Sequence, residues 1–328
     1  MSAPAPSTTT EVSFTSHGVR CAAWHVRSAS EALARDGRRP VVVLAHGFGG
    51  TRDTGLLVFA RAFADAGIDA LVFDYRTFGD SDGEPRQQVS YRMQREDYRA
   101  AVDAARRLPG VDPERIALWG TSYSGGHVID VAAGDPRIAA VVGLVPATDG
   151  AAALLQVARY AGPILPLRLV GHGLWDVATA VAGRAPHRIP LAARPGDPGI
   201  ITTSGSYEAY TAMGGPTWRN EVCARTALEI GLNRPTTKAG RVTCPVLFQV
   251  GTRDRVAPAA AARRTAARIA GPAEVAEYPI DHFDGYDGPW RDVAIADEVA
   301  FLTRVLLPTS VAPRPTGRRS RHGESSTA

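Results

Sequence analysis

Short apolar strands alternate with helices along most of this chain, and that alternation constrains its fold more than any other feature. The β-branched run VVVLAH at 41–46 is typical of a buried strand, and a helix is predicted to follow around 53–66. Further strands are expected at 19–26, 70–75, 115–120, 138–145, 245–251 and 273–279, and further helices at 93–107, after residue 120, at 258–270 and near 288–306. Strands joined by helices of this length predict a mostly parallel, doubly wound α/β sheet with right-handed crossovers.

Residues 151–240 interrupt this rhythm and are rich in Gly and Pro. A structureless loop of this length is implausible, so we expect the segment to be an inserted lid. The α/β core would then comprise residues 11–150 and 241–308. The two ends, 1–10 and 309–328, are rich in Pro, Ser and Thr, and both are predicted to be disordered tails.

Composition excludes several classes of function. The formal net charge is +4, and the basic C-terminal tail accounts for most of it, because it contains four arginines and one glutamate. The charge is therefore not spread over a folded face, and we expect no nucleic-acid partner. The three cysteines are too few and too scattered for a disulfide framework or a zinc site. We find no signal peptide and no apolar run of membrane-spanning length, so a cytoplasmic location with no membrane partner is predicted.

The stretch GTSYSGG at 120–126 raises the question of a nucleophile, because it lies between a strand and a helix. A serine on such a sharp elbow needs small residues two positions before and two after it. The apolar strand ends at Trp119, so Ser122 falls on the turn while Ser124 falls in the first helical turn. Ser122 is the favoured nucleophile. The alternative is that both serines merely cap the helix.

A serine hydroxyl reacts only with a base beside it and an acid that orients the base. Where the nucleophile lies on a strand-to-helix elbow, the acid and the base are both expected later in the sequence than the serine. Asp254 lies just past the strand 245–251, and His282 lies just past the next strand. Because the carboxyl ends of parallel strands meet at one edge of the sheet, the two side chains are expected near Ser122.

Other residues compete for these roles. Asp149 follows the strand 138–145 and is a second candidate for the acid. Asp281 is adjacent to His282, but neighbouring side chains should diverge, so it is a poor orienter. His127 and His46 are less favoured as bases, because neither lies beyond the last strand.

Backbone N–H groups that stabilise an oxyanion are the remaining requirement of such chemistry. The stretch HGFGG at 46–50 overlaps the end of a strand, and its glycines allow the backbone to turn inward. The N–H groups of Phe48 and Tyr123 are the expected donors. Nucleotide binding is excluded, because the G-x-G-x-x-G spacing and the following Lys-Ser/Thr are both missing.

Five motifs together resemble the α/β-hydrolase superfamily over roughly 40–306: HGFGG, FDYRTFGDSDG, GTSYSGG, GTRDRVAP and DHFDGY, in the family's order. The chain looks most similar to a lidded bacterial branch that groups serine aminopeptidases, dienelactone hydrolases and Xaa-Pro peptidase-like esterases. The resemblance implies a Ser122–His282–Asp254 triad. One departure is that the usual G-x-S-x-G ends here in Ser124, which is still small enough for the elbow.

We therefore predict a serine hydrolase that cleaves a carboxylic ester or related acyl bond of a small molecule, with no metal or organic cofactor. An acyltransferase, a thioesterase of secondary metabolism, a peptidase, and a slow-turnover binding protein remain the alternatives. A homodimer is compatible with the sequence. The apolar residues of the lid can supply a wall over the site: Leu154, Leu155, Ile164, Leu165, Leu167 and Leu169.

Overall fold

The computed structural model describes residues 7–307, and its centre is an eight-stranded sheet in the order β1-β2-β4-β3-β5-β6-β9-β10. The pairs β1–β2 and β2–β4 are antiparallel, and the remaining pairs of neighbouring strands are parallel. The strands are β1 (Thr8–Ser16), β2 (Val19–Arg27), β3 (Arg39–Ala45), β4 (Asp69–Phe73), β5 (Val111–Thr121), β6 (Ile138–Leu144), β9 (Val246–Gly251) and β10 (Ala273–Tyr278). The predicted mostly parallel α/β sheet is confirmed.

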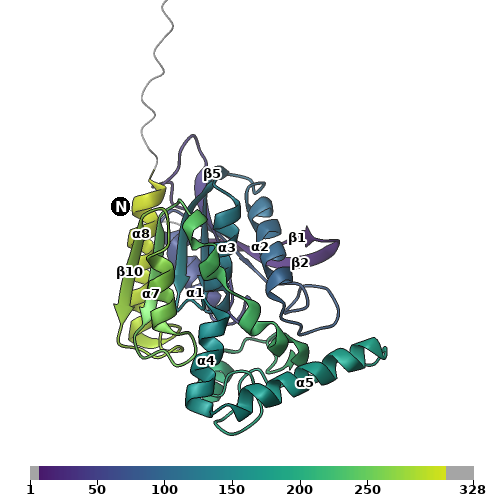
Figure 1. Cartoon of the computed structure of the whole chain (residues 1–328). Coiled ribbons are helices and arrows are strands. Elements are labelled where there is room, and N and C mark those ends of the chain that lie inside the picture. Colours follow the sequence, from purple (N-terminus) through teal and green to yellow (C-terminus); the bar gives the residue numbers. More distant parts are fainter. Residues whose placement is uncertain (1–6, 308–328) are drawn as a thin grey trace, which may run out of the picture.

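Helices cover both faces of this sheet (Figure 1). One face packs against α2 (Tyr91–Ala105), α3 (Tyr123–Gly134) and α7 (Ala259–Ala266), and the other against α1 (Leu56–Asp65) and α8 (Gly288–Leu306). The strand β3 shows why two layers are needed. Val43 belongs to the core on one face and Leu44 to the core on the other, and both side chains are fully buried. Side chains alternate along a strand, so an all-apolar strand must be covered twice.

The chain between β6 and β9, residues 145–245, forms a separate group of elements that we call the insert. Its helices α4 and α5 lie beyond the carboxyl ends of the strands, below the sheet in Figure 1. The insert contains α4 (Gly150–Ala161), α5 (Ile164–Val181), β7 (Arg188–Ile189), α6 (Ser206–Met213), β8 (Val222–Cys223) and the short 3₁₀ helices Ala224–Leu228, Ile230–Leu232, Pro235–Thr237 and Ala239–Arg241.

Residues 8–10 correct one prediction, because they belong to strand β1 rather than to a disordered tail. Thr8 pairs with Arg27 and Thr10 with His25, so β2 supplies the backbone partners that the isolated sequence does not reveal. Residues 1–6 and the predicted tail 309–328 lie outside the described residues. Within 7–307, the helices are all too short or too polar to cross a bilayer.

Candidate active site

Ser122 occupies a strained turn between β5 and α3. Its backbone has φ 52° and ψ −114°, a conformation that residues other than glycine rarely adopt. The chain doubles back tightly here: a Cβ added at Gly120 would lie 2.3 Å from the carbonyl oxygen of Ser124. The predicted elbow therefore forms, and the residue two positions before Ser122 must be glycine.

Ser122, His282 and Asp254 form one continuous hydrogen-bonded chain. The His282 Nε2 atom lies 3.0 Å from the Ser122 Oγ, and Nδ1 lies 2.7 Å from the Asp254 Oδ2. All three residues are buried. Because an ionised carboxylate only accepts hydrogen bonds, Nδ1 carries the proton and Nε2 is free to accept the serine proton. The structure thus brings together the three residues that the sequence singled out.

Asp254 is itself held in place by the loop that follows β9. Its second oxygen, Oδ1, accepts hydrogen bonds from the backbone N–H groups of Val256 (2.8 Å) and Ala257 (2.7 Å). These two bonds leave Oδ2 to face His282. The carboxylate is therefore oriented before any substrate arrives.

Ser124 has a different environment from Ser122. Its hydroxyl donates to the main-chain carbonyl of His46 and lies 2.7 Å from the Tyr75 hydroxyl. It is 1% exposed and lies on the first turn of α3. Ser124 therefore ties the elbow to the ends of β3 and β4.

The rival acids hold other groups. Asp149 accepts from the first N–H groups of α4 and pairs with Arg234, whose Nη2 lies 3.0 Å away. Asp281 accepts from the backbone N–H of Arg255 at 3.0 Å and from that of His282 at 2.8 Å. Neither carboxylate hydrogen-bonds to the imidazole of His282 in the described structure.

The rival bases are buried, and burial lowers the pKa of each imidazole. The pKa of His46 falls to about 4, and Nδ1 bonds to the Gly47 carbonyl at 2.9 Å. The pKa of His127 falls well below its usual value, and its Nε2 lies 3.0 Å from the Gln94 Oε1. Both imidazoles are therefore neutral and engaged elsewhere, which leaves His282 as the histidine bonded to Ser122 among the described residues.

The loop after β3 carries Phe48 close to the serine. Both Phe48 and Tyr123 line the space beside Ser122, and within residues 7–307 neither of their backbone N–H groups has a hydrogen-bond partner. The carbonyl of Phe48 accepts from the Tyr210 hydroxyl at 2.6 Å. That bond, which sequence reasoning did not find, fixes the peptide plane on one side of the loop.

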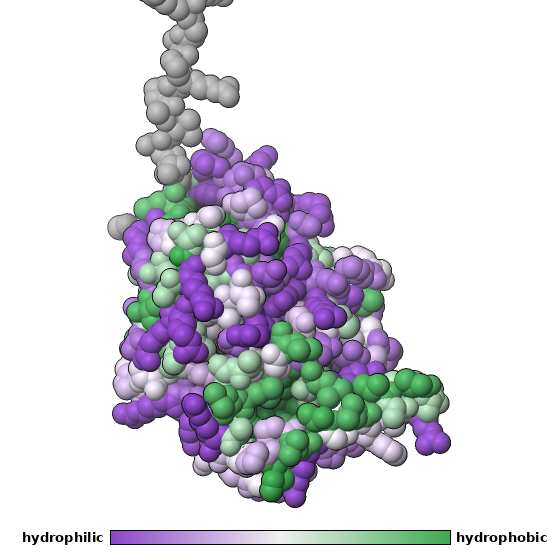
Figure 2. Space-filling model, viewed as in Figure 1, coloured by the Kyte–Doolittle hydropathy of each residue, from purple (hydrophilic) through white to green (hydrophobic). Residues whose placement is uncertain are grey.

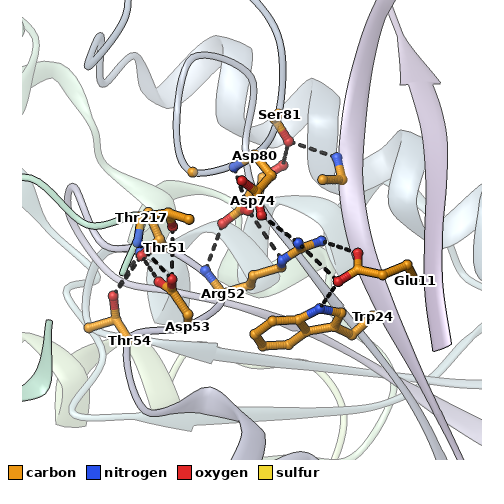
Figure 3. Close-up of polar contacts among 12 residues, drawn as sticks. Glu11, Trp24, Thr51, Arg52, Asp53, Thr54, Asp74, Asp80, Ser81 and Thr217 are labelled. Atoms are coloured by element: carbon orange, nitrogen blue, oxygen red, sulfur yellow. Dashed lines mark hydrogen bonds and ion pairs between the residues drawn. The ribbon is translucent and has the colours of Figure 1, made fainter. Parts of the chain in front are cut away.

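A polar network behind this loop was also missed (Figure 3). The backbone N–H of Arg52 donates to the Asp74 Oδ1 at 2.7 Å, and its guanidinium donates to Asp80 at 2.7 Å. Asp53 accepts from the backbone N–H of Thr217 in the insert at 2.9 Å. Burial raises the pKa of Asp74 to about 7. The network joins the Phe48 loop, the loop after β4 and the insert.

An apolar cavity of about 90 Å³ opens beside Ser122, between the sheet and the insert. The insert supplies most of its wall. The lining residues are Phe48, Ser122, Tyr123, Ala147, Asp149, Gly150, Ala153, Leu154, Val157, Leu169, Ile200, Ile201, Ile230, Asn233 and Val256.

The insert lines this cavity with fewer of its leucines than the sequence suggested. Leu154 and Leu169 do line it. Leu155, Ile164 and Leu167 instead are 53%, 61% and 69% exposed. They belong to α4 and α5, over which Figure 2 shows an extended apolar surface. For Ile164 and Leu167 the expectation failed because α5 presents apolar residues all round, so its sequence pattern does not show which side is buried.

A second opening also borders Ser122. A narrow pocket of about 20 Å³ borders Ser122 and His282. It shares Met213, Phe283 and Tyr286 with an open groove of about 700 Å³. Ser122 therefore borders an apolar cavity and a narrow pocket, and the lining of that pocket continues into a wider, more polar groove.

Comparison with known proteins identifies a matching family and related sequences. The family model for serine aminopeptidase S33 matches residues 36–279. The quorum-quenching protein AidA of Acinetobacter baumannii is 38% identical over 303 residues, which is 92% of this chain and 96% of AidA. The thiohydrolase aneE of Aspergillus aculeatus is 42% identical over 107 residues, but these cover 33% of this chain and 34% of that protein.

Solved structures support the fold. The α/β hydrolase GrgF from Penicillium superposes with a TM-score of 0.77 at 23% identity, covering 91% of this chain and 99% of that one. The structure of DcsB in complex with its substrate analogue gives the same TM-score, identity and coverage. At this identity the likeness is evidence for the shared architecture.

Proposed function

The chain belongs to the serine aminopeptidase S33 family of α/β hydrolases, and from this premise we propose that it is a serine hydrolase cleaving a carboxylic ester or related acyl bond. The observation that carries the proposal is the Ser122–His282–Asp254 chain, with contacts of 3.0 and 2.7 Å. A nucleophile, a base and an oriented acid within hydrogen-bond distance are the elements of acyl transfer to serine.

The reaction proceeds in two halves. Ser122 Oγ attacks the substrate carbonyl carbon while His282 Nε2 takes its proton, and the backbone N–H groups of Phe48 and Tyr123 donate to the developing oxyanion. His282 then protonates the departing oxygen, which leaves as an alcohol and an acyl-enzyme remains. Water attacks the acyl carbon with His282 again as base, and the carboxylic acid leaves Ser122 with its proton restored. Asp254 keeps the imidazole in the required tautomer throughout.

The apolar cavity supports a place for the acyl group beside Ser122. Leu154, Leu169 and Ile201 bound it, and each methylene buried there contributes about 0.8 kcal/mol. The leaving group would then lie in the narrow pocket beside His282 and in the open groove that shares its lining. The insert thus acts as a lid over the acyl group.

Hydrolysis of p-nitrophenyl esters by the purified chain tests this function. We expect turnover of short- and medium-chain esters by the native protein and none above background by Ser122→Ala. A folded native protein without activity on esters, thioesters or aminoacyl amides would contradict the proposal.

Acyl transfer or thioester cleavage is a second candidate, because thiohydrolases and polyketide transferases match about a third of the chain. Adding an alcohol or amine acceptor separates transfer from hydrolysis: a transferase forms the acylated acceptor at the expense of the free acid.

The similarity to AidA adds the proposal that this chain, too, quenches quorum sensing. A reporter strain exposed to treated spent medium tests this, with Ser122→Ala as the control.

A further inference from the structure

Helix α5 of the insert turns an apolar side to solvent. Seven of its large apolar side chains are between 40% and 85% exposed, among them Leu167, Trp175 and Val181. From residue 164 to residue 181, Arg168 is the one charged residue whose side chain is exposed. Figure 2 shows the apolar surface over this helix. Soluble monomers rarely expose a large contiguous apolar patch, so this side of α5 is expected to have a partner.

The opposite side of α5 is fixed to the rest of the insert, so the helix cannot roll over to bury its apolar side. A Cβ added at Gly173 would lie 2.8 Å from the Leu228 side chain. Asp176 is fully buried, and its Oδ2 accepts from the Arg225 guanidinium at 2.7 Å. At Gly171, by contrast, an added Cβ would meet nothing within 4 Å. The outer side of α5 is therefore held open to a second molecule.

Exposed residues along the middle of this outer side recur at alternating intervals of three and four. That spacing is the a and d pattern of a helix that packs along a second helix. We call these residues the α5 seam, and all of them are exposed: Ile164, Leu167, Gly171, Leu174, Ala178 and Val181. A strict a and d stripe is narrower than the face that a helix usually turns to a protein core. The seam therefore indicates a single helix as the partner.

The spacing of the α5 seam is symmetric about the middle of the helix, so it reads the same in both directions. If two α5 helices paired antiparallel, Leu174 would lie opposite the second copy of Gly171, and Leu167 opposite the second copy of Ala178. Large side chains would then meet small ones, and each contact would occur twice about a two-fold axis. We propose that the protein forms a homodimer in which α5 packs antiparallel against α5 of a second copy through this seam. The inference does not depend on the proposed function.

A second copy fits this side better than a lipid surface does. Helices that lie on a bilayer carry a polar face rich in Lys and Arg opposite the apolar one. Here the face opposite the seam packs on protein around the ion pair of Asp176 with Arg225. A bilayer would also gain nothing from the order of large and small residues, whereas a second helix needs a hole wherever a large side chain enters.

Sedimentation velocity of the full chain tests the dimer. At micromolar concentration we expect the native protein to sediment as two chains. Leu174→Glu places two carboxylates beside the two-fold axis, and it should raise the dissociation constant about thirtyfold or more, the effect of losing one interface hot spot. Val293→Glu is the matched control and should leave the dimer intact, because Val293 is 43% exposed on α8, outside the insert. Circular dichroism checks that both variants fold.

Cross-linking tests the antiparallel arrangement and does not add charge to the seam. A short bismaleimide should join Leu174→Cys chains to each other, because both copies of this position lie near the axis. Val181→Cys chains should not join to each other, since antiparallel pairing separates them by about 25 Å along the helices. They should instead join to Ile164→Cys chains. The native protein, with its three cysteines, is the control.

Flotation with vesicles of phosphatidylcholine and phosphatidylglycerol decides the lipid alternative. We expect the native protein to remain unbound, and flotation that Leu174→Glu abolishes would assign the seam to a membrane instead. A native protein that is monomeric at tens of micromolar would overturn the inference, as would a Leu174→Glu variant that dimerises as tightly as the native protein. Efficient cross-linking of Val181→Cys chains to each other would indicate a parallel pair and would overturn it as well.

Discussion

The Ser124 hydroxyl lies 2.7 Å from the hydroxyl of Tyr75 and donates to the His46 carbonyl. The second serine of the elbow is thus a structural link between strand ends, and the departure from glycine at this position has a use. Ser124→Ala should lower the free energy of unfolding by about 1–3 kcal/mol, since it leaves buried partners unpaired. Denaturant unfolding measures this.

Activity distinguishes the two serines further. The Ser124→Ala enzyme should keep most of its kcat, because its hydroxyl does not contact His282. If its kcat falls as far as that of Ser122→Ala while the fold stays intact, the assignment of a purely structural role is wrong.

Asp254→Asn should lower kcat by about 10⁴-fold without unfolding the protein. The amide nitrogen would donate to the His282 Nδ1, so the ring proton would move to Nε2 and block acceptance from Ser122. Steady-state kinetics measures the loss, and circular dichroism checks the fold. Asp149→Asn is the matched comparison, because asparagine can still cap α4. A larger loss in that variant would place the acid after β6.

The length of the acyl chain should determine the rate through the cavity. We expect kcat/KM to rise from acetyl to butyryl or hexanoyl esters, by up to about fourfold per methylene, and then to fall as the cavity fills. Leu154→Trp should move the optimum to shorter chains because the larger side chain occupies the cavity. Leu155→Trp is the control, since Leu155 is 53% exposed and does not line the cavity. A profile that falls steadily from acetyl would contradict the acyl cavity.

Stability should depend on pH through Glu298, which is fully buried on α8 and accepts from the Trp119 indole N–H at 2.9 Å. Burial raises its pKa from 4.5 to about 8. The unfolded chain releases this proton near pH 4.5, but the folded chain holds it to about pH 8. The group therefore makes folding progressively less favourable as pH rises through that window. Glu298→Gln should remove this part of the pH dependence and unfold at a higher temperature than the native protein at pH 8.5. An unchanged pH profile of Tm would contradict the assignment.

The sheet and the hydrogen-bonded group Ser122–His282–Asp254 could be predicted from the sequence. Both depend on the order in which strands and the loops after them follow one another. Ser122, Asp254 and His282 each follow a strand, and parallel strands bring their carboxyl ends together whatever the intervening loops do. Strand β1 could not be predicted in full, because Thr8 and Thr10 acquire their order from pairing with β2 rather than from an apolar pattern.

The supporting contacts were beyond the sequence for a different reason. Tyr210 reaches the Phe48 carbonyl, and Arg95 reaches the Asn233 amide, across 162 and 138 positions of the chain. No periodicity or motif spacing connects positions so far apart. These contacts depend on how the insert folds back over the sheet, which only the tertiary structure provides.

Labelling with a fluorophosphonate probe, followed by mass spectrometry of the tryptic peptides, tests the central claim that Ser122 is the nucleophile. The probe should form one adduct, on Ser122, and the adduct should be absent from Ser122→Ala and strongly slowed in His282→Ala. An adduct on Ser124, or labelling that persists undiminished in Ser122→Ala, would contradict the account.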